Sequence, residues 1–98
     1  MTETRNAIIT DARIFIEDHG ILTFFIDLDY GGQMQDFGGY DVRTNLGVWV
    51  QDILNAFEVD DWNKLKGKPC RARLDDSRLI RSIGNLIKEK WVTPPTKP

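Results

Sequence analysis

The sequence predicts a single α+β domain in which one amphipathic helix packs on an antiparallel β-sheet, with the elements in the order β-β-β-α-β-β. Its length of 98 residues, 41% of them hydrophobic, suits one domain with one core. Segments near the N-terminus alternate between apolar and polar residues, whereas a central segment repeats apolar residues at spacings of three and four. We therefore expect one domain over residues 1–92 and a flexible proline-rich tail over residues 93–98.

The first two strands are expected to form a β-hairpin. In the first strand, the alternation predicts a buried face made of Ile8, Thr10, Ala12, Ile14 and Ile16. Residues 18–20, Asp-His-Gly, have the composition of a turn. In the second strand, the alternation places Leu22, Phe24, Ile26 and Leu28 on one face and Thr23, Phe25, Asp27 and Asp29 on the other.

Two glycine pairs bracket the segment from Tyr30 to Tyr40. Glycine pairs are typical of turns and of close backbone approach, so we predict a short third strand over Gln33–Phe37 with a bend at each end. The aromatic residues of this segment are either packed as in an ordinary bent edge strand or free to stack on a planar ligand.

The helix is predicted over Leu46–Phe57, because apolar residues recur there at helical spacing. They are Leu46, Trp49, Val50, Ile53, Leu54 and Phe57. This stripe is either consumed by the core or shared with a second copy in a homodimer.

The remaining third of the chain predicts a capped turn and two strands. Asp60 or Asp61 can cap a short turn over Trp62–Leu65. Cys70–Leu74 alternates, with its two arginines on one side, and Leu79–Ile83 suits a last strand. Residues 85–91 are expected to be an irregular or single-turn closing segment.

The net charge of −2 is unevenly distributed along the chain. Residues 1–42 hold eight acidic and two basic side chains, a balance of −6, whereas residues 43–98 hold seven acidic and eleven basic side chains, a balance of +4. The two halves either pair with each other or form an acidic face and a basic face. The candidate acidic face is Asp27, Asp29, Asp36 and Asp41, and the candidate basic face is Arg71, Arg73, Arg78 and Arg81.

No motif for catalysis, metal binding or nucleotide binding is found. His19 is the one histidine and Cys70 the one cysteine, so a zinc site of ordinary spacing is excluded. Neither Ser77 nor Ser82 lies in a Gly-x-Ser-x-Gly elbow, and the glycines after Tyr30 match no phosphate-binding fingerprint. We expect a protein that is not an enzyme and that has no cofactor.

The sequence also bears on the compartment and on the class of partner. No apolar stretch is long enough to span a bilayer, and the N-terminus lacks the pattern of a secretion signal, so we expect a cytoplasmic protein without membrane contacts. With a pI near 5.3, direct binding to nucleic acid is not expected.

Several short segments resemble a family of small proteins of unassigned function found in tailed phages and prophages. The segments are Glu17–Phe24, Asp29–Gly32, Phe37–Tyr40, Val59–Trp62, Leu65–Lys68, the pair Arg71 and Arg73, and Ile83-Gly-Asn-x5-Trp91. The resemblance extends from about residue 7 to residue 91 and implies a phage gene expressed in a bacterial cytoplasm, without implying a catalytic activity.

These observations lead to one hypothesis and two alternatives. The leading hypothesis is a non-enzymatic phage accessory protein that binds a host protein or ribonucleoprotein and inhibits or redirects it, as an anti-CRISPR or other anti-defence factor would. Charged faces would supply recognition, and the aromatic anchors would be Tyr30, Phe37, Tyr40 and Trp91. The alternatives are a binder of a nucleotide-like ligand that uses residues 30–40, and a self-assembling phage component.

Overall fold

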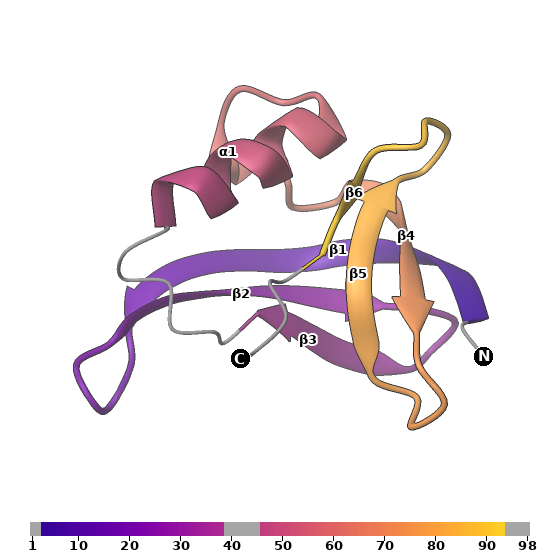
Figure 1. Ribbon diagram of the computed structural model, residues 1–98, viewed down its shortest axis with the longest axis horizontal. Coiled ribbons are helices and arrows are strands. Elements are labelled where there is room, and N and C mark those ends of the chain that lie inside the picture. Colours follow the sequence, from indigo (N-terminus) through magenta and orange to yellow (C-terminus); the bar gives the residue numbers. More distant parts are fainter. Residues whose placement is uncertain (1–2, 39–45, 94–98) are drawn as a thin grey trace.

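One antiparallel sheet of six strands carries the single helix of the described residues (Figure 1). The structure is a computed structural model that describes residues 3–38 and 46–93. The strands lie in the order β3-β2-β1-β4-β5-β6. Their bounds are β1 (Glu3–Ile16), β2 (Leu22–Asp29), β3 (Met34–Gly38), β4 (Pro69–Leu74), β5 (Ile80–Asn85) and β6 (Trp91–Val92); the helices are α1 (Leu46–Phe57) and the 3-10 helix η1 (Trp62–Lys64). The predicted single α+β domain is confirmed.

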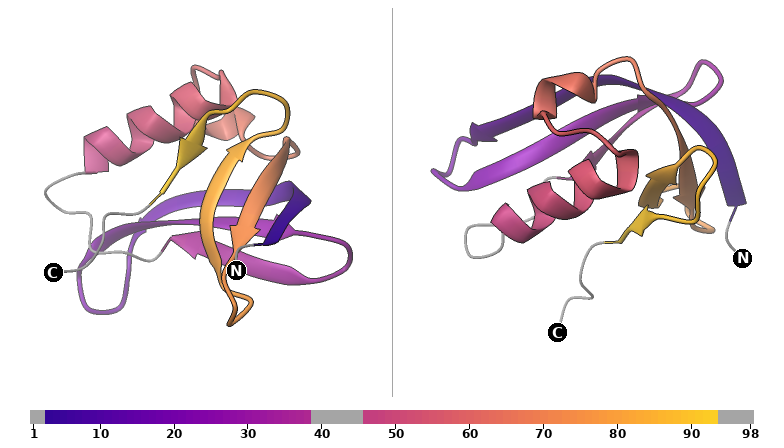
Figure 2. Two further views of the ribbon diagram at one scale, coloured as in Figure 1. Left: turned by 45° about the vertical axis from the view of Figure 1, so that its right-hand side comes forward. Right: turned by 90° about the horizontal axis from the view of Figure 1, so that it is seen from above.

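The sheet is strongly curled, so that β4 and β5 cross the direction of β1, β2 and β3 (Figures 1 and 2). Helix α1 covers the concave side of this curl. The curl also brings β3 close to β5, although the two strands are not paired in the sheet. The side-chain amide of Gln35 on β3 bridges the gap: its Oε1 accepts a hydrogen bond of 2.6 Å from the backbone N–H of Ile80.

A β-bulge at Thr10 reverses the faces predicted for the first half of β1. Ile9 pairs with Leu28 and Asp11 with Asp27, so Thr10 is the extra residue. Before the bulge, Ala7 and Ile9 face the core and Ile8 is 51% exposed. The predicted burial of Ile8 was therefore wrong, because strict alternation does not anticipate an inserted residue.

Beyond the bulge, Ala12, Ile14 and Ile16 lie on the predicted face, opposite the core residues of β2. Ala12 packs against the core. Ile14 and Ile16 are 38% and 65% exposed, because they lie toward the tip of the β1–β2 hairpin.

The faces predicted for β2 are confirmed. Phe24, Ile26 and Leu28 are fully buried. Phe37 on β3 pairs with Ile26, so it points to the same side. The ring of Phe24 lies 6.2 Å from that of Phe37 and 5.7 Å from that of Trp49, and these contacts join the sheet to the helix.

Helix α1 has the predicted bounds. Trp49, Ile53 and Phe57 are buried against the sheet, as the spacing indicated, and Ala56 joins them. The stripe therefore supplies one side of the core. No helix of the described residues has the length and apolar character needed to span a membrane.

After the helix, the structure follows the prediction as far as β5 and then departs from it. Asp61 caps η1 by accepting a hydrogen bond from the N–H of Asn63. Trp91, predicted as the end of an irregular or single-turn segment, and Val92 form β6 against Ile83 and Gly84. A two-residue strand is too short for an alternating pattern. Residues 94–98, the predicted tail, lie outside the described residues.

Candidate functional site

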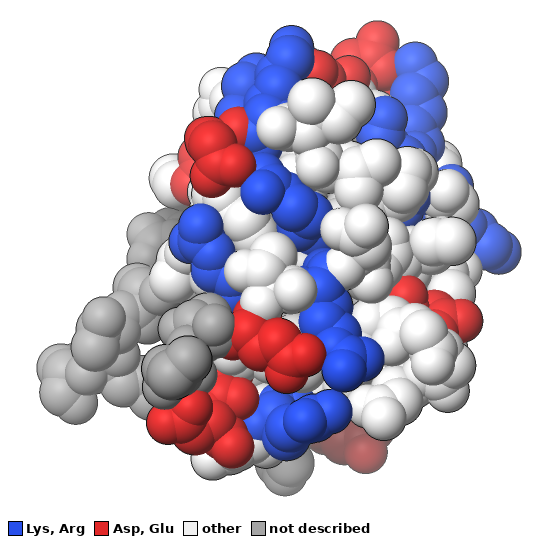
Figure 3. Space-filling view, turned by 90° about the vertical axis from the view of Figure 1, so that its right-hand side faces the viewer, with Lys and Arg blue, Asp and Glu red and all other residues white. Residues whose placement is uncertain are grey.

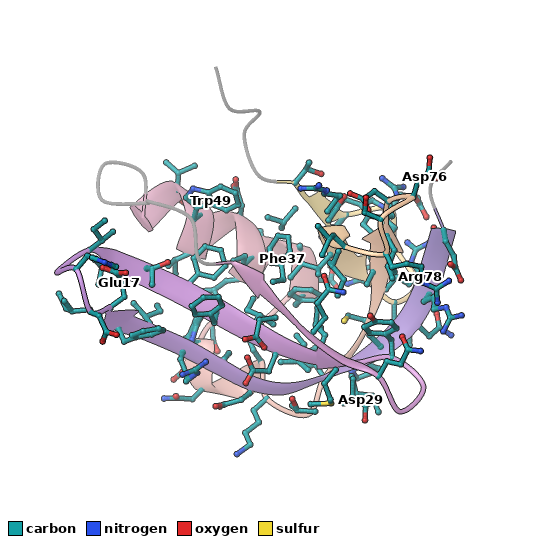
Figure 4. All side chains as sticks on the ribbon, turned by 90° about the horizontal axis from the view of Figure 1, so that it is seen from below. Glu17, Asp29, Phe37, Trp49, Asp76 and Arg78 are labelled. Carbon is teal, nitrogen blue, oxygen red and sulfur yellow. The ribbon has the colours of Figure 1, made fainter. Side chains whose placement is uncertain are left out.

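The outer face of the sheet, opposite helix α1, carries most of the predicted site residues. Figure 4 shows Asp29 on this outer side, whereas Phe37 and Trp49 lie between the sheet and the helix. Strand alternation explains the separation, because a residue next to a core residue in sequence faces outward. The face has an acidic end on β1–β3 and an end with arginines on β4–β6.

Three aspartates form a row across the acidic end, one on each strand. Asp11 on β1 pairs with Asp27 on β2, and Asp27 pairs with Asp36 on β3. We call this set the acidic row. Among the described residues, the cation nearest to the row is Arg13, whose guanidinium lies 3.8 Å from Asp27 and 3.9 Å from Asp11. The acidic face predicted from the sequence included Asp27 and Asp36 but not Asp11, although strand alternation already places Asp11 on the outer face.

Asp27 holds its proton more tightly than an ordinary aspartate. Its Oδ1 is buried and accepts no hydrogen bond from the described residues. Burial, followed by the hydrogen bond and the negative charge of Asp36, raises the pKa of Asp27 from 3.8 to about 6. At neutral pH the row is therefore a concentration of negative charge with little internal compensation.

Asp29 lies one pleat beyond the acidic row on the same face. Its Oδ1 accepts a hydrogen bond of 2.9 Å from the N–H of Gly32, which fixes the carboxylate beside the β2–β3 turn. Two of the predicted acidic residues, Asp27 and Asp36, are thus cross-strand neighbours, and Asp29 is close to them. Asp41 lies outside the described residues.

At the other end of the face, Arg71 and Arg73 pack against Trp91. Their guanidinium carbons lie 4.8 Å and 3.7 Å from the centre of the indole ring. Arg71 also donates to the carbonyls of Asn85 and Lys88 and forms an ion pair of 2.8 Å with Glu89. Arg71 is thus tied into the loop before β6, and Arg73 is the more available cation.

The other two predicted arginines lie at the β4–β5 end of the sheet, Arg78 in the turn and Arg81 at the start of β5. Arg81 pairs with Asp75 at 2.5 Å, and Arg78 adopts a left-handed φ of 67° in the β4–β5 turn. Figure 3 shows this side of the molecule, where Lys and Arg side chains form a band that is interrupted by Asp and Glu. The ion pairs of Arg81 with Asp75 and of Arg71 with Glu89 join residues of the same half of the chain, so they are local and do not pair the acidic half with the basic half.

The predicted aromatic anchors are largely internal. Tyr30 is 5% exposed and Phe37 is 1% exposed, so the expectation that they contact a partner was wrong. Tyr30 continues the core face of β2, and Phe37 lies on the core face of β3. Trp91 is half-buried beneath its arginines, and Tyr40 lies outside the described residues.

A different aromatic pair lies on the outer face. Phe15 and Phe25 stack with their ring centres 5.8 Å apart, and Arg13 lies 5.2 Å from the centre of the Phe15 ring. Both phenylalanines alternate with residues on the core side of the sheet and share their strand faces with polar residues. This pattern in β1 and β2 could have identified them as residues of the outer face.

A hollow of about 440 Å³ lies where the β2–β3 turn meets β1 and β4. Its lining includes Asn6, Ile8, Asp29, Gly31, Pro69 and Leu86. We call it the turn hollow. Gly31 and Gly32, one of the two glycine pairs noted in the sequence, line this hollow, whereas the aromatic residues beside them do not.

The described residues offer little for covalent or metal chemistry. Within residues 3–38 and 46–93, no three His, Cys, Asp or Glu side chains are arranged so that they could hold one metal ion, and this includes the acidic row. Burial raises the pKa of the Cys70 thiol to about 12, which suppresses the nucleophilic thiolate. His19 lies in the exposed β1–β2 turn, where its Nδ1 is 3.0 Å from Glu17.

The chain matches no protein-family model, no curated protein and no solved structure.

Proposed function

We propose that this protein is a non-enzymatic binding protein that recognises a host protein or ribonucleoprotein through the outer face of its sheet and inhibits or redirects it. The observation that carries the proposal is the acidic row, which lies across three adjacent strands with Arg13 as its nearest cation in the described part of the chain. Aspartates directly opposite one another repel and reduce stability. A surface that keeps such an arrangement is better explained by recognition than by folding.

The acidic row fits a partner with a positively charged surface. Complementary charge accelerates encounter and selects against wrong partners, whereas apolar contacts supply most of the affinity. On the outer face these contacts come from the Phe15–Phe25 stack on one side of the row and from the turn hollow on the other. Basic channels of ribonucleoproteins are one class of surface that such a face complements.

A non-enzymatic role is supported by the chemistry of the reactive side chains. The Cys70 thiol is fully buried, and His19 lies in a turn far along the chain from either serine. Nucleophilic catalysis by a thiol or a serine hydroxyl needs an accessible nucleophile with a base within hydrogen-bond reach.

The biological setting of the proposal is infection of a bacterium by a phage. It rests on the resemblance of the short motifs to phage and prophage proteins, and it places the protein in the host cytoplasm. Anti-CRISPR or other anti-defence activity is the form of inhibition we propose in that setting.

A small-ligand function is the second candidate, because the turn hollow lies beside Gly31 and Gly32. A nucleotide-like ligand would need an aromatic surface for its base. Tyr30 and Phe37, the aromatic residues of the segment, are committed to the core. The hollow therefore favours an aliphatic group over a stacked base.

The proposal is tested by capture of the tagged protein's partner from lysate of a host bacterium, with size exclusion and mass spectrometry as readouts. The test variant carries Asp11→Asn and Asp36→Asn, which remove two charges from the acidic row. The control carries Asp18→Asn and Asp52→Asn, which remove two exposed charges elsewhere. We expect a stoichiometric complex that the control retains and the test variant loses. No complex at high protein concentration, or equal complexes with both variants, would overturn the proposal.

A further inference from the structure

The turn hollow is bordered by apolar side chains that are exposed on a face rich in carboxylates. Ile8 is 51% exposed and Leu86 is 36% exposed, and both line the hollow together with Pro69. Pro69 pairs with Ile8 across β4 and β1, so the two side chains are neighbours. The hollow thus offers a site of aliphatic character.

Acidic groups lie beside this apolar lining in a regular arrangement. Ile8, Asp29 and Met34 occupy one row across β1, β2 and β3. The acidic row lies one pleat away along the same strands. An apolar hollow and four carboxylates therefore share one continuous part of the outer face.

The carboxylate at the rim of the hollow is held in place without a positive partner. Asp29 accepts the hydrogen bond from Gly32 N–H, and among the described residues no cation lies within 4.0 Å of its carboxylate. Arg13 is directed to Asp11 and Asp27 instead. A positively charged group of a binding partner would complement the Asp29 carboxylate at this rim.

We propose that the turn hollow and the adjacent carboxylates bind a basic peptide segment of the partner, with an aliphatic side chain in the hollow and lysine or arginine side chains on Asp29 and Asp36. This inference rests on the proposed function and specifies the chemistry of the partner. A volume of about 440 Å³ is at the lower end of the range for ligand sites, which suits one or two aliphatic side chains.

Other classes of ligand fit the same surface less well. Phosphate groups of a nucleic acid or nucleotide would be repelled by the carboxylates. A divalent cation would need several oxygen ligands at one point, and in residues 3–38 and 46–93 no three candidate ligands, those of the acidic row included, converge so that they could hold one ion. A peptide satisfies both the charge and the apolar lining.

The experiment is a titration of the ¹⁵N-labelled protein with three synthetic pentapeptides, followed by NMR. The first probe is Lys-Arg-Leu-Lys-Arg, the second replaces its leucine by serine, and the third is Glu-Glu-Leu-Glu-Glu, all with blocked ends. We expect saturable shifts at the amides of Ile8, Gly31 and Leu86 with the first probe. The serine probe should bind at least fivefold more weakly, and the acidic probe should give no shifts.

Matched variants separate this site from general attraction to basic peptides. Asp29→Asn keeps an acceptor for Gly32 N–H and removes the charge, and Leu86→Ser removes the apolar lining. Asp18→Asn and Leu79→Ser make the same changes in exposed turns away from the hollow. We expect at least fivefold weaker binding for the first pair and unchanged binding for the second.

Equal effects of both pairs, or shifts scattered over all acidic residues, would overturn the inference. If Asp29→Asn and Leu86→Ser retain a host complex that loss of the acidic row abolishes, this inference fails and the proposed function stands. If no host complex forms with the unaltered protein, the proposed function itself fails.

Discussion

The side-chain amide of Gln35 is hydrogen-bonded to the main chain of Ile80, which lies 45 residues later in the sequence. Its Oε1 accepts from the Ile80 N–H at 2.6 Å, and its Nε2 donates to the carbonyl of Arg78 at 3.0 Å. The amide group thus imitates a peptide unit and joins β3 to β5 where no strand ladder joins them. This bridge keeps the sheet curled around helix α1.

Replacing Gln35 by alanine is therefore expected to destabilise the fold. The change leaves the half-buried N–H of Ile80 without its acceptor, and a loss of about 1–3 kcal/mol in the free energy of unfolding is expected. Urea unfolding followed by tryptophan fluorescence measures it. The control is Gln33→Ala at an exposed turn position, for which a change within about 0.5 kcal/mol is expected. Equal stabilities of the two variants would contradict the role of the bridge.

Gly84 and Trp91 give a second prediction. A Cβ atom on Gly84 would lie 2.6 Å from Cδ2 of Trp91 and 2.9 Å from the carbonyl oxygen of Lys90. Gly84→Ala must therefore displace β6, at a cost of about 1–3 kcal/mol. The same substitution at Gly47 meets nothing within 4 Å and lies in α1, so Gly47→Ala should instead stabilise the protein, by up to about 1 kcal/mol. Thermal unfolding of the two variants should shift in opposite directions, and a shift in the same direction would refute the contact.

The acidic row predicts a dependence of stability on pH. Asp27 has a folded-state pKa of about 6 against an ordinary value of 3.8, so between these values the folded state binds more protons than the unfolded state. Stability contributed by this group is present at low pH and is lost as the pH rises toward 6. Asp36, Asp11 and Arg13 are the charged groups that face it.

Asp27→Asn is therefore expected to raise the free energy of unfolding at pH 7.5 and to leave it nearly unchanged at pH 3.5. The gain should be about 1 kcal/mol, because the side chain is 25% exposed and solvent screens part of the repulsion. Urea unfolding at both pH values measures it. Asp18→Asn in the exposed turn is the control and should show no such difference between the two pH values. A gain at pH 3.5 equal to that at pH 7.5 would exclude titration as the cause.

Much of the fold follows from local pattern. The faces of β2 and the bounds of α1 were predicted, and the cap of η1 was narrowed to Asp60 or Asp61, because each depends on residues close together in sequence. The features that were missed depend on distant residues. Thr10 is the extra residue of a bulge that lies just past the end of the β1–β4 pairing, and its hydroxyl donates to the carbonyl of Asp27 on β2. No window around Thr10 contains that information.

The candidate site was predictable in part for the same reason. Asp27 and Asp29 were placed on one outer face by strand alternation alone. The row that joins Asp27 to Asp11 and Asp36 requires the register of three strands, and the register follows from the bulge and the turns. The prediction of aromatic anchors failed because it did not apply strand alternation to Tyr30 and Phe37. The alternation places both side chains on the core face.

Asn85 gives the last prediction and bears on the meaning of the Ile83-Gly-Asn-x5-Trp91 motif. Its Nδ2 donates to the carbonyl of Ala56 near the end of α1 at 2.9 Å, and its Oδ1 accepts from the N–H groups of Ile87 and Lys88 at 3.0 Å. One side chain therefore fixes the loop before β6 and holds the helix to it.

Asn85→Ala removes these three hydrogen bonds at once and is expected to cost about 2 kcal/mol or more in the free energy of unfolding. Asn55→Ala on the exposed side of α1 is the control and should be neutral or slightly stabilising, because alanine favours the helix. Urea unfolding and binding to the captured host partner should be measured on both. If Asn85→Ala loses stability while the protein that remains folded binds normally, the motif serves the fold and not recognition. Normal stability with lost binding would instead assign the motif to recognition and would extend the binding surface to the β5–β6 loop.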